Sequence, residues 1–217
     1  MPSVGSVATV LMLLAGSAHA HFKVLQPDTI QPFDDDGEGD GPCGGYTPSP
    51  NGLNATEFHV DGDTIYTTLT HPEATWLYRI TTDLTAGGNW SEVYPQFQQN
   101  GAGAYCTYPA TIPHEFIGQT AILGVVANAP DGLLYQCSAV TFVEGSVPRS
   151  ADCHNASGVT ATYTSDPDLT SQLGNPSVAP DEHATSVGVS NKSDSFRGLG
   201  AMVTVGVMAV LGAVMLV

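Results

Sequence analysis

The chain has 217 residues, of which 21 are acidic and only 5 are basic, so its formal net charge is −16 at pH 7. Phosphate groups would repel a surface this acidic, which makes nucleic acid and anionic lipid poor partners. Cations and neutral polymers suit the composition better.

The chain begins with an apolar run, residues 4–17, that is too short to cross a bilayer. The small-x-small sequence Ala18-His19-Ala20 follows it, which is the pattern that signal peptidase cleaves. We therefore predict a signal peptide over residues 1–20. Its removal would leave His21 as the first residue of a secreted protein.

From His21 onward the pattern is that of short strands separated by loops. Residues 21–27 alternate up to Pro27 and predict a first strand, and residues 33–52 form a long irregular loop rich in Gly, Pro and Asp. The only helical segment that we expect is a short one at 113–118. Further strands are predicted where β-branched and aromatic residues recur, at residues 64–70, 75–81, 120–129 and 133–143. The fold class is therefore all-β, as an immunoglobulin-like antiparallel β-sandwich over residues 21–158.

Beyond this domain the composition changes to Ser, Thr, Pro, Asp and Gly, and we expect a disordered stalk over residues 159–190. Residues 191–217 end in an uncharged apolar stretch and resemble a GPI-anchor signal that is removed. The small residues that could carry the anchor are Ser186, Gly188, Ser190 and Asn191. A single-pass or tail-anchored helix is the alternative, although no basic residue follows the stretch. The expected location is the outer face of the cell membrane or the cell wall.

The cysteines and sequons fit this secretory route. Four cysteines predict two disulfides with three possible connectivities, and we favour Cys106–Cys137 together with Cys43–Cys153. Zinc ligation is the alternative, but no C-x-x-C spacing supports it. N-glycosylation is expected at Asn54, Asn89 and Asn155, and also at Asn191 if that residue is retained.

An N-terminal histidine is a metal-binding group in itself. Its α-amine and imidazole have reference pKa values of about 7.7–8.0 and about 6.5, so a metal ion can displace their protons near neutral pH. A second histidine would complete three nitrogen ligands in a tetragonal arrangement, which selects copper(II). This arrangement is called a histidine brace.

His71 is the candidate that we favour for the second histidine. It stands at the end of a predicted strand, immediately before Pro72, whereas a loop or surface role explains the others more simply. Those others are His59, His114, His154 and His183. A carboxylate for the site could come from Asp131, although Asp-Gly is also ordinary turn chemistry, or from the acidic loop at Asp34, Asp35 and Asp36, with Glu38 and Asp40 nearby.

Several motifs together resemble a known family: the N-terminal HF, then PFDDD, PCGGY, HPEATWLY, a mid-domain YC and DGLLYQC, with a GPI-type tail. The chain is similar over residues 21–153 to fungal copper-binding proteins that share the fold of lytic polysaccharide monooxygenases. The resemblance implies a cell-surface protein that binds copper through His21 and His71 without cleaving polysaccharides. It also implies an aspartate at the copper, for which Asp131 is the matching position. Many relatives instead read CAD after the strand cysteine, where this chain has Cys137-Ser138-Ala139.

Three functions follow from these observations. The first is a non-enzymatic, monomeric protein that binds one copper(II) ion for acquisition or cell-wall processes, beside a membrane copper transporter or cell-wall glycans. The second is a copper-dependent polysaccharide monooxygenase, whose flat sugar-binding face would need exposed aromatic residues such as Trp76, Trp90, Tyr94 and Tyr105. The third is a structural cell-wall protein with an incidental terminal histidine. A serine-nucleophile enzyme is excluded by the lack of a G-x-S-x-G motif.

Overall fold

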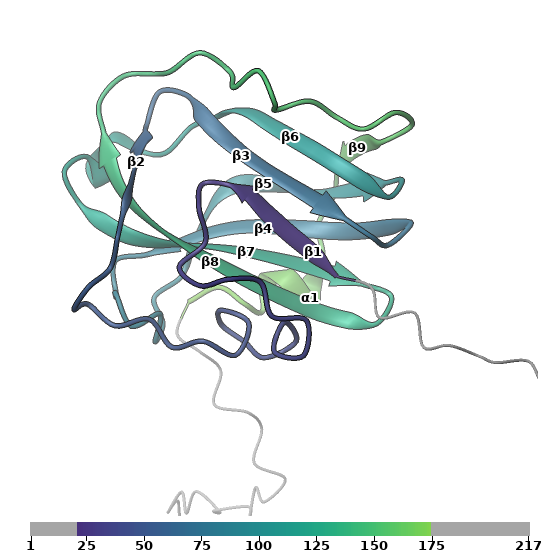
Figure 1. Ribbon diagram of the computed structural model, residues 1–217, viewed down its shortest axis with the longest axis horizontal. Coiled ribbons are helices and arrows are strands. Elements are labelled where there is room, and N and C mark those ends of the chain that lie inside the picture. Colours follow the sequence, from purple (N-terminus) through teal and green to yellow (C-terminus); the bar gives the residue numbers. More distant parts are fainter. Residues whose placement is uncertain (1–20, 175–217) are drawn as a thin grey trace, which may run out of the picture. The chain divides into compact units, whose positions relative to one another are not determined.

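The computed structural model describes residues 21–174 as a sandwich of two β-sheets (Figure 1). The smaller sheet has the strand order β1 (Phe22–Gln26), β3 (Asp63–Leu69) and β6 (Gly103–Ala110). The larger sheet has the order β2 (Thr56–His59), β8 (Gly132–Val143), β7 (Thr120–Ala129), β4 (Glu73–Thr81), β5 (Ser91–Asn100) and β9 (Thr160–Tyr163). Every pair is antiparallel except β2 with β8. The predicted all-β sandwich is confirmed.

Side chains point alternately to the two faces of each central strand, and those on the inner face form the core between the sheets. On β7, every second side chain from Ala121 to Ala129 points into the same cluster as the even-numbered residues of β4 from Ala74 to Ile80. Phe22, the first residue of β1, is fully buried there and packs edge-on against Trp76, with 5.1 Å between ring centroids. The strand that follows His21 is therefore anchored by one of the largest contacts in the core.

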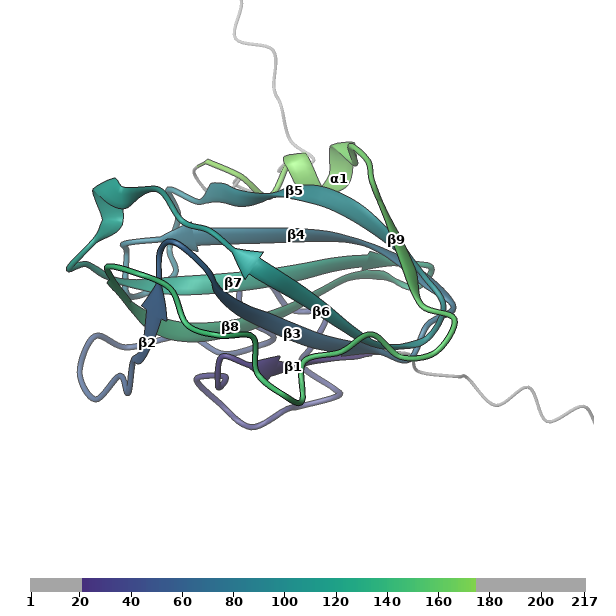
Figure 2. The same ribbon diagram turned by 90° about the horizontal axis from the view of Figure 1, so that it is seen from above.

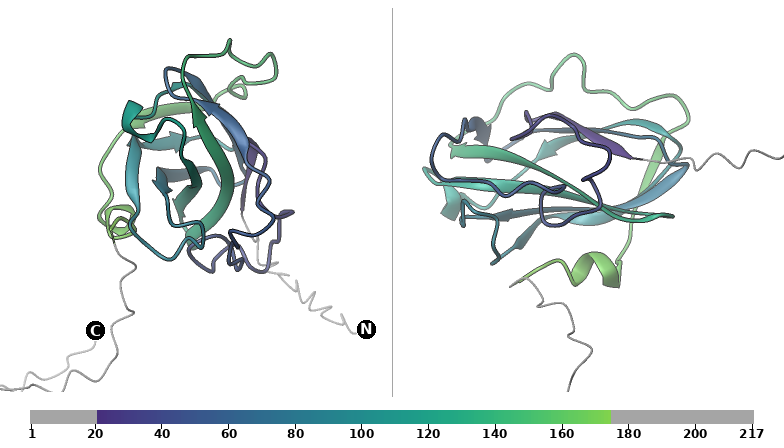
Figure 3. Two further views of the ribbon diagram at one scale, coloured as in Figure 1. Left: turned by 90° about the vertical axis from the view of Figure 1, so that its left-hand side faces the viewer. Right: turned by 60° about the horizontal axis from the view of Figure 1, so that its bottom comes forward.

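The other face of the larger sheet is also covered. Part of the long loop between β1 and β2 packs on it through Cys43, Ile30 and Leu53. The short helix α1 (Pro167–Thr170) lies outside the sandwich and buries Leu169 completely against Leu77 and Val126 (Figures 2 and 3). Because both faces are covered, the central strands read as nearly continuous apolar runs.

The C-terminal limit of the domain differs from the prediction. We expected a stalk from residue 159, but β9 pairs with β5 and α1 follows it, so residues 159–174 belong to the folded domain. Residues 159–174 are held by the pairing of β9 with β5 and by one buried leucine, Leu169. The sequence did not predict this because the segment has no regular pattern of apolar residues. The predicted signal peptide, the remaining stalk and the GPI signal lie outside the described residues.

The disulfide pairing that we favoured is wrong. Cys43 bonds to Cys137 and Cys106 bonds to Cys153. Cys106 lies on β6 and Cys137 on β8, which belong to different sheets, whereas the β1–β2 loop runs directly over β8 and brings Cys43 to it. All four cysteines are used, as predicted.

Two short helical segments occur within residues 21–174. The 3-10 turn η1 (His114–Phe116) lies within the expected helical segment at 113–118, and α1 is four residues long. Neither is long enough to cross a bilayer, so residues 21–174 contain no candidate membrane-spanning helix.

Candidate metal centre

Strand pairing brings His21 and His71 to the same end of the smaller sheet. Phe22 pairs with Leu69 in the antiparallel ladder, so His21 lies opposite Thr70, one residue before His71. The Thr70 backbone N–H donates to the His21 carbonyl at 2.9 Å, and the His21 backbone N–H donates to Thr70 Oγ1 at 2.8 Å. Two histidines 50 positions apart in the sequence are thus fixed on adjacent strands.

One nitrogen of each imidazole is shielded from solvent and lacks a hydrogen bond. His21 Nδ1 and His71 Nε2 each have almost no accessible surface and no hydrogen-bond partner among the described residues. Buried polar atoms are nearly always paired, so two unpaired ring nitrogens on neighbouring histidines need an explanation. A metal ion is one, since a neutral imidazole nitrogen is a common metal ligand.

Each of these nitrogens has a carboxylate beside it. His71 Nε2 lies 2.7 Å from Asp131 Oδ1, and His21 Nδ1 lies 3.0 Å from Asp35 Oδ1. Both distances are those of ion pairs, and neither nitrogen makes a hydrogen bond.

The two carboxylates come from different parts of the chain. Asp131 occupies the turn between β7 and β8, and Asp35 belongs to the predicted acidic loop, so each predicted source contributes one group. Asp34 and Asp36 lie on the same loop, but they make no ion pair with either histidine. Within residues 21–174 no three His, Cys, Asp or Glu side chains converge as a preformed metal site. A three-ligand site here needs a ligand that is not a side chain, and the α-nitrogen of His21 is such a ligand.

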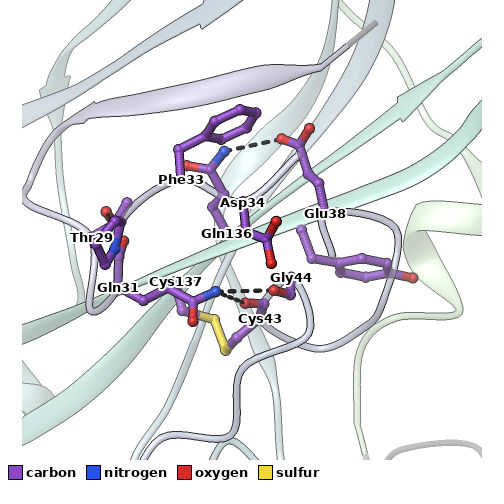
Figure 4. A pocket seen from close by; sticks show the side chains of 11 residues that line it. Thr29, Gln31, Phe33, Asp34, Glu38, Cys43, Gly44, Gln136 and Cys137 are labelled. Atoms are coloured by element: carbon purple, nitrogen blue, oxygen red, sulfur yellow. Dashed lines mark hydrogen bonds between the residues drawn. A yellow bond between two sulfur atoms is a disulfide. The ribbon is translucent and has the colours of Figure 1, made fainter. Parts of the chain in front are cut away.

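A buried pair of side chains, Glu38 and Gln136, holds β1 in place next to His21, and Figure 4 shows the hydrogen bond between the two. Gln136 on β8 donates through Nε2 to the Phe22 carbonyl at 2.6 Å and accepts through Oε1 from the Val24 N–H at 3.0 Å. Glu38 Oε1 accepts from the Phe22 N–H at 3.2 Å and from Gln136 Nε2 at 3.0 Å. These bonds satisfy the edge of β1 that no strand covers, and they close the gap between the two sheets.

Glu38 is only 2% exposed, and burial raises its pKa from 4.5 to about 7 despite the hydrogen bonds that Gln136 and Phe22 donate to it. The negative charges of Asp35 and Asp131 act in the same direction as burial. A substantial fraction of Glu38 is therefore neutral at neutral pH, which lowers the energy needed to keep it inside.

Sequence reasoning did not identify Gln136 or Phe33 as part of this site, and it named Glu38 only as a member of the acidic loop. Phe33 packs against the His21 ring, with 5.1 Å between centroids, and the Lys23 ammonium lies 4.4 Å above the Phe33 ring. The PFDDD motif contains Phe33, but nothing in its pattern reveals which ring it contacts.

The remaining histidines are accounted for differently. His59 contacts Asp63 at 3.1 Å and His114 contacts Asp61 at 2.6 Å, away from His21 and His71. His154 is exposed, and His183 lies outside the described residues, as do the candidate anchor residues from Ser186 to Asn191. The three sequon asparagines inside the domain, Asn54, Asn89 and Asn155, are all exposed.

Compared with known protein families, the chain matches the one described as copper acquisition factor BIM1-like over residues 19–158, which is more than half of its length. A search among curated proteins finds no match. The matched segment includes His21, His71, Asp35 and Asp131, together with all four cysteines.

Proposed function

Since the chain belongs to the BIM1-like copper acquisition factor family, we propose that it captures one copper(II) ion between His21 and His71. His21 supplies its α-nitrogen and Nδ1, and His71 supplies Nε2. Asp131 is the carboxylate of the site, with Asp35 beside it. Nitrogen-rich tetragonal sites favour copper(II) over the other common divalent metals.

The observation that carries this proposal is the pair of unpaired ring nitrogens, held on neighbouring strands by the β1–β3 ladder. The nitrogens left without partners are the ones that the chelate needs. Nδ1 of His21 can share an ion with the α-nitrogen of the same residue, and Nε2 of His71 can approach that ion from the adjacent strand.

The proposal requires that His21 be the first residue. A peptide nitrogen shares its lone pair with the carbonyl and carries a proton, so it is a much weaker copper ligand than a free α-amine. We propose that removal of residues 1–20 during secretion creates this amine, and that a GPI anchor then holds the protein at the cell surface. The His21 nitrogen already faces Thr70 Oγ1, which would orient the amine once it is free.

We further propose that the protein binds copper without catalysis. Asp131 places a negative carboxylate against the metal-binding face of His71, where it would occupy a coordination position. The aromatic face that a polysaccharide monooxygenase needs is also reduced, because Trp76 and Trp90 are 0% and 4% exposed and belong to the interior. The activity test is incubation of the copper-loaded protein with a reductant and chitin, cellulose or glucan. Release of oxidised oligosaccharides would overturn this part of the proposal.

Copper binding itself is tested on protein that begins at His21, by native mass spectrometry, isothermal titration and electron paramagnetic resonance. We expect one copper(II) per chain, with a spectrum that shows several nitrogen ligands. His71→Ala and a form with one added alanine before His21 should each weaken binding by at least about 100-fold, since each removes a ligand that held the ion.

His59→Ala is the matched control, because His59 is also a partly buried histidine next to an aspartate but lies elsewhere. It should bind copper like the wild type. Unchanged affinity in both the His71→Ala and the extended form would refute the brace.

A further inference from the structure

A second concave site lies on the β1–β2 loop, separate from the metal centre. Its two walls are the loop segments 28–32 and 46–56, and the cleft between them has a volume of about 520 Å³. This is within the size range of small-molecule sites, about 300–1,000 Å³. None of the residues that line it belongs to the metal centre, since His21, Asp35, His71 and Asp131 are all absent from its walls.

Both walls are anchored to the sandwich. Thr29 forms a bridge with Ser138, and the Ile30 N–H donates to the Cys137 carbonyl at 2.9 Å. On the opposite wall Leu53 packs into the cluster around the Cys43–Cys137 disulfide. The cleft is therefore built into the fold and does not depend on a ligand to form it.

The chemistry of the lining is that of a site for neutral, hydroxyl-rich molecules. Asn51 and Asn54 offer amide donors and acceptors, and Tyr46, which is 36% exposed, offers a ring face. Asp28 is the only charged side chain among the lining residues, and no lysine, arginine or histidine lines the cleft. An anionic ligand would find no counter-charge there, whereas a sugar presents both hydroxyl groups and apolar C–H faces.

We infer that this cleft binds a neutral carbohydrate. Two sources share this chemistry. One is a glycan attached to the chain itself, because Asn54 lines the cleft and begins the sequon Asn54-Ala55-Thr56. The other is a separate neutral polysaccharide. The two exclude each other in one molecule, since a glycan on Asn54 would fill the cleft.

The test uses the protein secreted by a eukaryotic host, as wild type and as Asn54→Gln, which keeps the amide but removes the sequon. Mass spectrometry of glycopeptides reports whether Asn54 is modified. Hydrogen exchange reports the protection of residues 46–56. Hexasaccharides of β-1,3-glucan, β-1,4-glucan and N-acetylglucosamine are titrated into both forms by calorimetry.

An internal glycan predicts a modified Asn54, slower exchange of residues 46–56 in the wild type than in Asn54→Gln, and oligosaccharide binding only to Asn54→Gln. A separate polysaccharide predicts oligosaccharide binding to the wild type, with no difference in exchange between the two forms before the sugar is added. Either pattern supports a carbohydrate site and identifies where the carbohydrate comes from. Absence of both the exchange difference and oligosaccharide binding overturns it.

Tyr46→Ala and Tyr163→Ala form a matched pair that ties the result to the cleft. Both tyrosines are exposed, but Tyr163 lies on β9 and outside the cleft. Tyr46→Ala, made in whichever form binds oligosaccharide, should weaken binding about tenfold, as expected for a central aromatic contact. Tyr163→Ala should leave it unchanged. Equal effects of the two substitutions would show that the sugar binds elsewhere and would overturn the inference.

Discussion

Replacing Glu38 by glutamine should abolish one component of the pH dependence of stability. The pKa of Glu38 rises from 4.5 in an unfolded chain to about 7 in the folded protein. Below pH 4.5 the group is protonated in both states, and its preference for the folded state is fully present. As the pH rises through 7 the folded protein must accept a buried charge, so this contribution is lost.

The magnitude follows from the size of the shift. Each unit corresponds to 1.36 kcal/mol, so the full shift from 4.5 to about 7 would amount to about 3.4 kcal/mol. Glu38 itself is buried, but Asp36 and Gly39 beside it in the loop are exposed, so a small movement of the loop would let water reach the charged form. We therefore expect about 2 kcal/mol. Glutamine is neutral at every pH and can still accept the bonds from Phe22 and Gln136.

The assay is urea denaturation of metal-free wild type and Glu38→Gln between pH 4 and 8. The difference in free energy of unfolding should change by about 2 kcal/mol across this range, in favour of the variant at high pH. Carboxylates that do not interact with Glu38 contribute equally to both proteins and cancel in the difference. A difference that stays constant from pH 4 to 8 would show that Glu38 has the same pKa in the folded and the unfolded protein and would refute the reasoning.

Three further substitutions test the packing around the site. Gln136→Ala removes the side chain that bonds the free edge of β1 and should lower the free energy of unfolding by about 2–3 kcal/mol in urea denaturation, with weaker copper binding. No loss of either property would mean that β1 is held by β3 alone. Leu169→Ala empties a fully buried position and should cost about 2–5 kcal/mol by the same measurement, whereas a loose stalk would give no change. Gly44→Ala places a Cβ 2.5 Å from the Tyr135 carbonyl at a residue with φ of 66°, and its melting temperature should fall well below that of Gly52→Ala, where φ is 86° but no atom lies within 4 Å. Equal melting temperatures would show that the loop moves away at no cost.

The sequence predicted β1 from its alternating side chains, and it predicted β4, β7 and β8 because their side chains are buried on both faces. Residues 120–129 match β7 from end to end, and 133–143 match β8 except for its first residue. The strands that it missed have weak or interrupted patterns. β5 contains Pro95 and several glutamines, and the ladder with β4 is irregular between Tyr94 and Phe97, so neither alternation nor composition identifies it. β2 and β9 are four residues long and lie at the sheet edges, where pairing with a neighbour determines the strand.

The two histidines of the candidate metal centre could be predicted because the signals for them are local in the sequence. His21 follows a cleavage pattern, and His71 ends a strand before a proline, so both could be named from the sequence. The disulfide partners, Gln136 and Phe33 could not, because their roles depend on which loop crosses which strand. Such contacts between distant segments have no signature in the residues themselves.

The start of β8 connects these separate parts. Asp131, in the turn before it, faces His71. Gln136 points inward and holds β1, and the next side chain, Cys137, points outward and fixes the acidic loop through Cys43. Successive residues of a strand point to opposite faces of the sheet. The seven positions 131–137 can therefore support the histidine pair on the inner face and, on the outer face, hold the loop that carries Asp35.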